Sequence, residues 1–202
     1  AASIDPGDAS IHYNLGFMAQ NLGKLDEARI RYETAISLNP DYADAHNNLG
    51  GKYQHRGWWD DAERSYEKTI ELKPKDGEAY YNLGNILQEL GKFDEAEAAY
   101  TDAINIKSDY YQAHNNLGNT LQELGRLDEA LASYSQAIAF KPDYAEAHYN
   151  LGITLQELGR LDEAVASYNQ AIALKPDYAE AHRYLTSMKI FDVQDEPVSY
   201  TH

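Results

Sequence analysis

Histidine recurs at an interval of 34 residues, and regularly spaced histidines are candidates for metal ligands. The column contains His12, His46, His114, His148 and His182, with Tyr80 in the remaining slot. Zinc needs its ligand atoms within about 2.0–2.1 Å of one ion. Side chains that recur once per structural repeat point in parallel from helices about 8–10 Å apart, so they converge poorly. We therefore expect no metal site here.

No other group of residues has the spacing of a catalytic site. Serine, histidine and aspartate are scattered along the chain, and the chain has no cysteine. The glycines do not form a loop of the kind that surrounds a phosphate. Carboxylate pairs such as Asp128 and Glu129 recur at positions that suit the start of a helix, where negative charge is favourable. We expect neither catalysis nor a cofactor.

Amide side chains form the most regular polar pattern in the sequence. An amide carries donors and an acceptor together, so it can bind both polar groups of a peptide bond. Rows of amides therefore suit an extended peptide held by its backbone. The predicted peptide-binding residues are Asn14, Asn48, Asn82, Asn116 and Asn150; Tyr13, Asn47, Tyr81, Asn115 and Tyr149; Asn85 and Asn119; and Gln54, Gln88, Gln122 and Gln156. The alternative is that these asparagines bond neighbouring helices.

The elements that position these side chains are repeats of 34 residues. The tripeptide Asn-Leu-Gly ends at Gly16, Gly50, Gly84, Gly118 and Gly152. Alanine, tyrosine, isoleucine and proline columns keep the same step, and internal repeats of this length indicate a stacked array. The five complete repeats span residues 9–42, 43–76, 77–110, 111–144 and 145–178.

Each repeat has the pattern of two helices. In the fourth, apolar residues at helical spacing predict a first helix over Gln112–Leu124, ended by Gly125. A second helix follows and ends near Phe140, before Pro142. Two amphipathic helices cannot bury each other fully, so repeats must stack. The small residues Gly118 and Ala130 are expected where the paired helices cross.

The pattern NLG…LGRLDEA…Y..AI..KPDYA resembles the tetratricopeptide repeat, over about 170 residues. The resemblance implies an all-α, right-handed superhelical solenoid whose first helices line a concave groove that binds peptides or proteins. A similar asparagine ladder lines the array of O-linked N-acetylglucosamine transferases. The histidine column matches the large aromatic packing position of the family.

Charge narrows the range of partners. The chain has 17 Lys+Arg against 33 Asp+Glu, a formal net charge of −16, which disfavours nucleic acids and anionic membranes. The groove positions carry acidic residues at Asp44, Glu78, Glu89, Glu123, Glu146 and Glu157. They carry no Lys or Arg, so capture of a C-terminal carboxylate is disfavoured and a basic peptide is expected. The alternative is a solvated acidic face.

The second repeat departs most from the others. Arg56 replaces the leucine before the turn, and Trp59 takes the slot of a core residue. Trp58 is an additional aromatic residue at the turn, either an interface anchor or a partly covered surface residue.

Both ends of the chain depart from the repeat pattern. By the period of 34, Ile4 and Pro6 place residues 1–8 as the tail of a preceding repeat. Residues 179–191 are expected to form a capping helix with a polar outer face. Residues 192–202 are expected to be disordered, and PVSYTH resembles translated sequencing-adapter read-through. We expect the chain to be an excerpt of a longer one.

These patterns predict a protein–protein interaction scaffold without catalysis of its own. The alternative is a substrate-recruiting segment of a larger glycosyltransferase or sulfotransferase, because LTSMKIFDVQDE resembles linkers that follow such arrays in sulfotransferase-like proteins. A structural solenoid that self-associates through its ends is a third hypothesis. No apolar run of about 18 residues predicts a membrane span, and a cytoplasmic location is expected.

Overall fold

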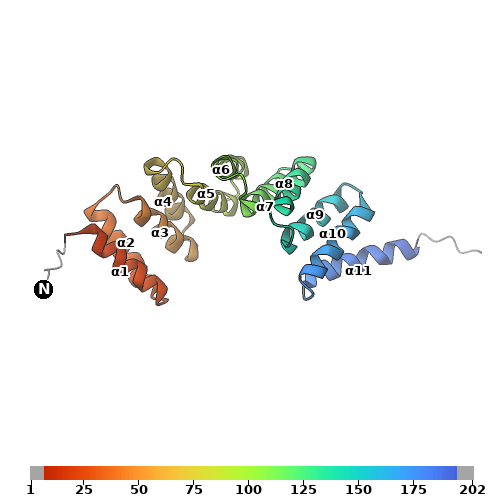
Figure 1. Cartoon of the computed structure of the whole chain (residues 1–202), viewed down its shortest axis with the longest axis horizontal. Coiled ribbons are helices and arrows are strands. Elements are labelled where there is room, and N and C mark those ends of the chain that lie inside the picture. Colours follow the sequence, from red (N-terminus) through yellow and green to blue (C-terminus); the bar gives the residue numbers. More distant parts are fainter. Residues whose placement is uncertain (1–6, 195–202) are drawn as a thin grey trace, which may run out of the picture. The chain divides into compact units, whose positions relative to one another are not determined.

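The computed structural model describes the backbone of residues 7–194 and the side chains of residues 7–187. This part of the chain contains eleven α-helices and no strand, which confirms the all-α prediction (Figure 1). The helices are α1 (Ala9–Asn21), α2 (Leu25–Leu38), α3 (Ala43–His55), α4 (Trp59–Leu72), α5 (Gly77–Glu89), α6 (Phe93–Ile106), α7 (Tyr111–Glu123), α8 (Leu127–Phe140), α9 (Ala145–Glu157), α10 (Leu161–Leu174) and α11 (Ala179–Gln194).

Each predicted repeat holds one helical hairpin, and a glycine with positive φ makes its turn. The five turn glycines have φ between 71° and 74°, a conformation that only glycine adopts without strain: Gly23, Gly57, Gly91, Gly125 and Gly159. The first helix of the fourth repeat runs over Tyr111–Glu123, one residue earlier than predicted. The difference arises because Leu124 already acts as the C-cap, where its N–H donates to Thr120.

The chain divides into two compact units, which are described separately. The N-terminal unit, Ala1–Ser108, contains the hairpins α1–α2, α3–α4 and α5–α6. The C-terminal unit, Asp109–His202, contains the hairpins α7–α8 and α9–α10, followed by α11. Within each unit, the second helix of one hairpin packs against the first helix of the next.

The core of every hairpin is a tyrosine ring on the second helix that lies against a glycine on the first. A β-carbon built on Gly118 would come within 2.5 Å of the ring of Tyr134. The same distance is 2.6–2.9 Å in the other four repeats, and all five tyrosines are at most 2% exposed. The sequence predicted a small residue at position 118 because the helix axes approach each other there. The structure adds a second reason, since the ring of Tyr134 occupies the space that a β-carbon would need.

Helix α11 caps the C-terminal unit. Leu185 packs with Tyr168 and Ala164 of α10, and Ala181 is fully buried. The helix spans Ala179–Gln194, whereas the sequence predicted a helix over 179–191 and a disordered tail over 192–202. Residues 192–194 of that tail are thus helical, and residues 195–202 lie outside the described residues. The predicted tail of a preceding repeat rests on Ile4 and Pro6, which also lie outside them.

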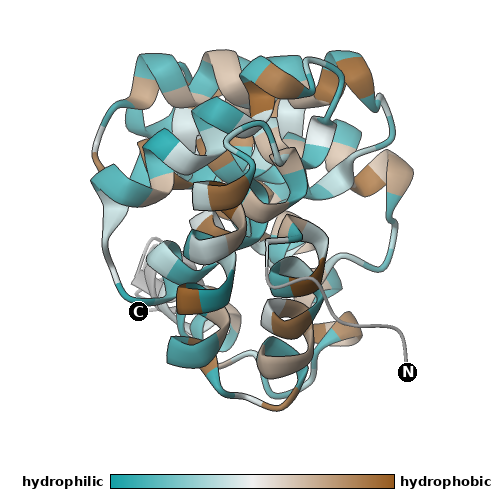
Figure 2. Cartoon of the chain, turned by 90° about the vertical axis from the view of Figure 1, so that its left-hand side faces the viewer, coloured by the Kyte–Doolittle hydropathy of each residue, from teal (hydrophilic) through white to brown (hydrophobic). Residues whose placement is uncertain are grey.

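Hydrophobic and hydrophilic residues alternate along the helices, as expected for amphipathic helices that stack on neighbours (Figure 2). Within the part of the chain that the structure describes, no helix is long and apolar enough to cross a membrane.

Two adjacent glycines of α3 test the ring-on-glycine contact. A β-carbon on Gly50 would lie 2.9 Å from the ring of Tyr66, whereas one on Gly51 would meet only the Tyr66 hydroxyl at 3.7 Å. We expect Gly50→Ala to destabilise the chain by about 1–3 kcal/mol through overpacking. Gly51→Ala should stabilise it by about 0.5–1 kcal/mol, because alanine is the better helix former.

Urea denaturation followed by circular dichroism measures both changes. Equal effects of the two substitutions would contradict the packing described above.

Candidate functional site

In the N-terminal unit, an asparagine bonds one first helix to the preceding one. The Nδ2 group of Asn48 on α3 donates to the hydroxyl of Tyr13 on α1 at 3.2 Å. The Tyr13 ring in turn stacks on Tyr42 with a centroid distance of 4.9 Å. Both Asn48 and Tyr13 are partly buried, so each keeps surface that a ligand can reach.

The C-terminal unit has a denser version of the same arrangement. Asn150 on α9 donates to the side-chain oxygens of Asn115 and Asn119 on α7 at 3.2 and 3.0 Å. The Nδ2 group of Asn115, which is fully buried, donates to Glu146 and Asn116 at 3.3 Å each. Successive first helices are therefore joined by an amide ladder, meaning the row Tyr13–Asn48 in one unit and Asn115–Asn119–Asn150 in the other.

The glutamines that recur every 34 residues have a structural role that the sequence analysis missed. The hydroxyl of each core tyrosine donates to the glutamine 12 residues earlier in the chain. The donor–acceptor distances are 3.1–3.2 Å for Tyr32–Gln20, Tyr66–Gln54, Tyr100–Gln88, Tyr134–Gln122 and Tyr168–Gln156. Asn85 and Asn119 accept from the same hydroxyls of Tyr100 and Tyr134 at 2.8 Å. The constant spacing of 12 residues was the available signal.

The predicted binding residues differ in exposure. Asn14 is exposed and Asn115 is buried, and the remainder are partly buried: Tyr13, Asn47, Asn48, Tyr81, Asn82, Asn85, Asn116, Asn119, Tyr149, Asn150, Gln54, Gln88, Gln122 and Gln156. They lie at corresponding positions of α1, α3 and α5 in the N-terminal unit and of α7 and α9 in the C-terminal unit. Their role in binding stays a prediction.

Buried threonines support the ladder in the C-terminal unit, and the sequence interpretation did not single them out. Thr154 is fully buried and donates to Gln122 on the neighbouring first helix at 3.3 Å. The Nε2 group of Gln122 donates to the exposed Glu157 at 3.0 Å. One glutamine therefore binds a core tyrosine, a threonine and a surface carboxylate together.

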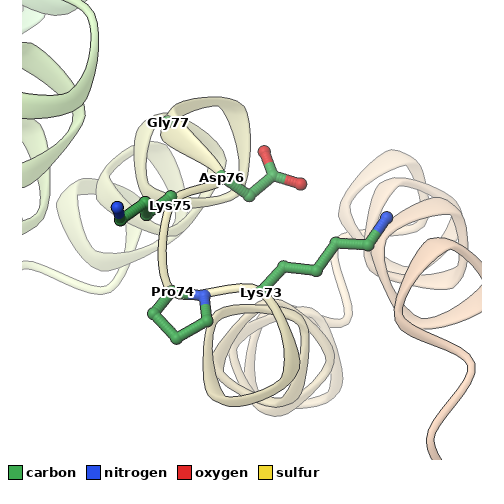
Figure 3. A pocket seen from close by; sticks show the side chains of 5 residues that line it. All are labelled: Lys73, Pro74, Lys75, Asp76 and Gly77. Carbon is green, nitrogen blue, oxygen red and sulfur yellow. The ribbon is translucent and has the colours of Figure 1, made fainter.

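The acidic residues predicted to lie in the groove are all exposed, but they differ in whether a cation lies nearby. Lys73 binds Asp44 at 2.5 Å, so this carboxylate already has a counter-charge. Figure 3 shows the Lys73 side chain extending away from the loop of Lys75 and Asp76, which lines a pocket of about 640 Å³. Glu78 and Glu89 on α5 are both exposed in the same unit. These two carboxylates therefore add negative charge to the exposed side of α5.

The histidine column forms hydrogen bonds between hairpins. The Nε2 atoms of His46, His148 and His182 lie 2.8–3.0 Å from the carbonyl oxygens of Pro40, Pro142 and Pro176, six residues earlier. A carbonyl oxygen only accepts, so each Nε2 carries the proton. His114 stacks on Phe140 at 5.4 Å. Within the described residues no group of three or more His, Asp and Glu side chains could hold a metal ion.

The two tryptophans of the second repeat differ as expected. Trp59 is partly buried and packs against the cluster of Ala62, Tyr66 and Ile86. Trp58 is 43% exposed, with the guanidinium groups of Arg29 and Arg56 at 5.9 and 5.7 Å from its ring. The flanking cations stabilise the exposed indole in one orientation.

The buried tyrosines predict an alkaline limit to stability. Burial raises the pKa of Tyr32 and of Tyr53 to about 12, and it raises the pKa of Tyr66, Tyr134 and Tyr168 as well. In an unfolded chain tyrosine titrates near pH 10. The free energy that these neutral hydroxyls contribute is therefore complete below about pH 10 and is lost as the pH rises toward 12.

We expect cooperative unfolding in that pH window. Circular dichroism should lose helical signal at the same pH at which tyrosinate absorbance rises. Tyrosine ionisation that precedes the loss of helix by a whole pH unit would contradict this expectation.

Several solved structures are similar to this chain. The crystal structure of a MamA protein matches with a TM-score of 0.78 and 27% identity, covering 85% of this chain and 94% of the other. That of YrrB, described as a TPR protein with an unusual peptide-binding site, has a TM-score of 0.79 and 25% identity and covers 90% and 94%. PilF of Pseudomonas aeruginosa shares the fold at 17% identity, with a TM-score of 0.79 and coverage of 93% and 86%.

Comparison with curated protein sequences found no match. Family models described as "TPR repeat" or "Tetratricopeptide repeat" match residues 20–57 and 118–159, 41–109, 99–132 and 145–178. These matches run without a gap from residue 20 to residue 178, and the structures of MamA and YrrB share the fold. The chain therefore belongs to the tetratricopeptide repeat family.

Proposed function

We propose that this chain is a protein-interaction scaffold that holds an extended peptide segment on the amide ladder of its first helices, without catalysis of its own. The observation that carries the proposal is the orientation of Asn48 and Asn150. Each uses its Nδ2 group to bond the neighbouring helix. Bonds of this kind hold the amide in one rotamer before any ligand arrives, which reduces the entropy lost on binding.

The chemistry of the ladder suits a peptide backbone. A side-chain amide has two donors and an acceptor with two lone pairs, so one or two bonds to a neighbouring helix leave further capacity. The partly buried tyrosines beside the amides, Tyr13 in one unit and Tyr149 in the other, add apolar area with a polar tip. Such a surface places few demands on the sequence of the peptide.

The acidic residues favour a peptide that contains Lys or Arg. In the C-terminal unit Glu146 accepts from Asn115 and Glu157 accepts from Gln122, so both carboxylates lie beside the amides. In the N-terminal unit Glu78 and Glu89 are exposed on the first helix α5. Opposite charges on the peptide would speed its association with these surfaces.

The comparisons support the class of function. YrrB, which is 25% identical over 90% of this chain, is described as having a peptide-binding site. Recruitment of a substrate for a transferase rests on the sequence resemblance alone and stays a prediction.

Alanine substitution tests the ladder. A 12-residue peptide selected by phage display against the wild-type chain serves as the probe, and fluorescence polarisation measures its binding. We expect Asn48→Ala combined with Asn82→Ala, its counterpart 34 residues later on α5, to weaken binding about 10-fold or more, because each lost hydrogen bond to the peptide costs about 0.5–1.5 kcal/mol. Asn105→Ala, which removes an exposed amide from the second helix α6, is the matched control and should change nothing.

A second variant separates binding from stability. Tyr13→Phe removes the hydroxyl that accepts from Asn48 but keeps the amide itself. If the ladder serves only to join helices, Tyr13→Phe and Asn48→Ala should lower the melting temperature equally and leave peptide affinity unchanged. That result would refute the proposed function.

Salt dependence tests the charge preference. A selected peptide with several Lys or Arg residues should bind more weakly as ionic strength rises, because salt screens exposed charges. Glu78→Gln combined with Glu89→Gln should flatten that dependence. An affinity that does not change between low and high salt would exclude the electrostatic contribution.

A further inference from the structure

The amide ladder is interrupted in the second repeat, at Gly51 on α3. The second and third repeats can be compared, residue by residue, with the fourth and fifth repeats of the C-terminal unit. In this comparison Gly51 stands at the position of Asn119. Because glycine has no side chain, one carboxamide of the ladder is missing between α3 and α5. We call the space that this carboxamide would occupy the Gly51 gap.

The uninterrupted ladder of the C-terminal unit shows what the missing carboxamide does. The Oδ1 atom of Asn119 accepts from the hydroxyl of Tyr134 at 2.8 Å and from Nδ2 of Asn150 at 3.0 Å. Asn150 also donates to Oδ1 of Asn115 at 3.2 Å. One carboxamide oxygen thus joins a core hydroxyl to the amide of the next first helix.

The groups that would surround the missing carboxamide are present in the N-terminal unit, but the hydrogen bonds between them are not. The counterparts of Tyr134, Asn150 and Asn115 are Tyr66, Asn82 and Asn47. The Oδ1 atom of Asn47 is buried and has no hydrogen-bonding partner among the described residues. Asn82 therefore does not donate to Asn47, and Gly51 offers it no side-chain acceptor. Buried polar atoms without a partner are rare, so the network between α3 and α5 is incomplete.

The Gly51 gap is open space. Apart from the backbone of its own helix and its neighbours in the chain, a β-carbon built on Gly51 would have a single heavy atom of the described residues within 4 Å, the hydroxyl oxygen of Tyr66 at 3.7 Å. The corresponding positions of the other four repeats carry larger side chains: Phe17, Asn85, Asn119 and Ile153. Gly51 is partly exposed, so a side chain of a ligand can enter the gap from solvent.

The hydroxyl of Tyr66 lies below the surface of the ladder. Tyr66 is 2% exposed, so the backbone of a peptide that lies across the first helices stays out of hydrogen-bonding distance. A side chain is needed to reach the hydroxyl. In two other repeats the side chain at this place is that of asparagine, and Asn85 and Asn119 accept from the core hydroxyls at 2.8 Å. The chain itself thus shows that a carboxamide fits here.

The charges near the gap favour a neutral carboxamide over a carboxylate. Burial raises the pKa of Tyr66, and the negative charge of Glu78 raises it further. The Tyr66 hydroxyl therefore stays protonated at neutral pH and can donate to an incoming oxygen. The charge of Glu78 would repel a carboxylate that entered the same space.

From this comparison we infer that the Gly51 gap is a subsite for a carboxamide side chain of the bound peptide, supplied by a glutamine or an asparagine. The oxygen of that carboxamide accepts from the hydroxyl of Tyr66 and from Nδ2 of Asn82, as Asn119 does from its own two partners. The inference rests on the proposed function, since it needs a peptide on the first helices. It adds one sequence preference to a surface that otherwise places few demands on the peptide.

Filling the gap with a side chain of the protein tests its chemistry without any peptide. Thermal unfolding followed by circular dichroism compares Gly51→Asn with Gly51→Ala and with the isosteric Gly51→Asp. We expect Gly51→Asn to melt at the highest temperature of the three, because its carboxamide completes the bonds to Tyr66 and Asn82, although alanine is the better helix former. A Gly51→Asn chain that melts no higher than the other two would overturn the inference.

Peptide binding tests the ligand. The probes are 12-residue peptides selected by phage display against the wild-type chain, and fluorescence polarisation measures their affinity. We expect them to contain a glutamine or asparagine whose replacement by alanine lowers the affinity for the wild-type chain about tenfold. The same replacement should change little for Gly51→Asn, which supplies the carboxamide itself. Phe17→Asn is the matched control, because it adds a carboxamide one repeat earlier, where a side chain already fills the position, and it should keep the tenfold effect.

The outcomes separate the subsite from the ladder. Suppose that selected peptides lose affinity for Asn48→Ala but do not depend on a glutamine or asparagine, or that this dependence survives in Gly51→Asn. Either result would overturn the subsite and leave the proposed function standing. A chain against which no peptide can be selected would refute the proposed function, and the subsite with it.

Discussion

The contact on which every hairpin depends is a tyrosine ring lying against a glycine of the partner helix. The ring fills the space that the missing β-carbon leaves, and its hydroxyl donates to a glutamine 12 residues earlier. Because the hydroxyl is bonded, the ring can be buried without leaving a polar atom unpaired, which would cost about 1–3 kcal/mol. One residue therefore sets the distance between the two helices and also fixes the rotation of the first helix. The orientation of the amide ladder follows from that rotation.

The amide ladder joins neighbouring helices through the same side chains that we propose to contact a peptide. Asn150 bonds Asn115 and Asn119 of the neighbouring first helix, and Asn119 also accepts from the core hydroxyl of Tyr134. Such a surface is rigid, because hydrogen bonds to other side chains of the protein hold each amide in one orientation. The alternative to ligand binding was that the asparagines form hydrogen bonds to neighbouring helices, and these hydrogen bonds are present. They are also what pre-orients the side chains that we propose contact a peptide.

The sequence predicted the hairpins well because their signals are local. The turn glycine at 125 and the proline at 142 place the helix ends of the fourth repeat to within one residue. Gln122, in contrast, was assigned to peptide binding alone, since periodicity shows which face a residue occupies but not which atoms it bonds. The ion pair between Lys73 and Asp44 joins residues 29 positions apart on different elements, and no local pattern indicates it.

The histidine hydrogen bonds fix the tautomer of three rings at the turns between hairpins. In His46, His148 and His182 the proton that bonds the proline carbonyl is on Nε2. A neutral imidazole with its proton on Nε2 presents Nδ1 as an acceptor. Each ring therefore links the start of a first helix to the carbonyl group six residues earlier, and it does so with the same nitrogen in all three turns. A column of residues whose type suggests metal binding thus serves to hold the connections between hairpins in one conformation.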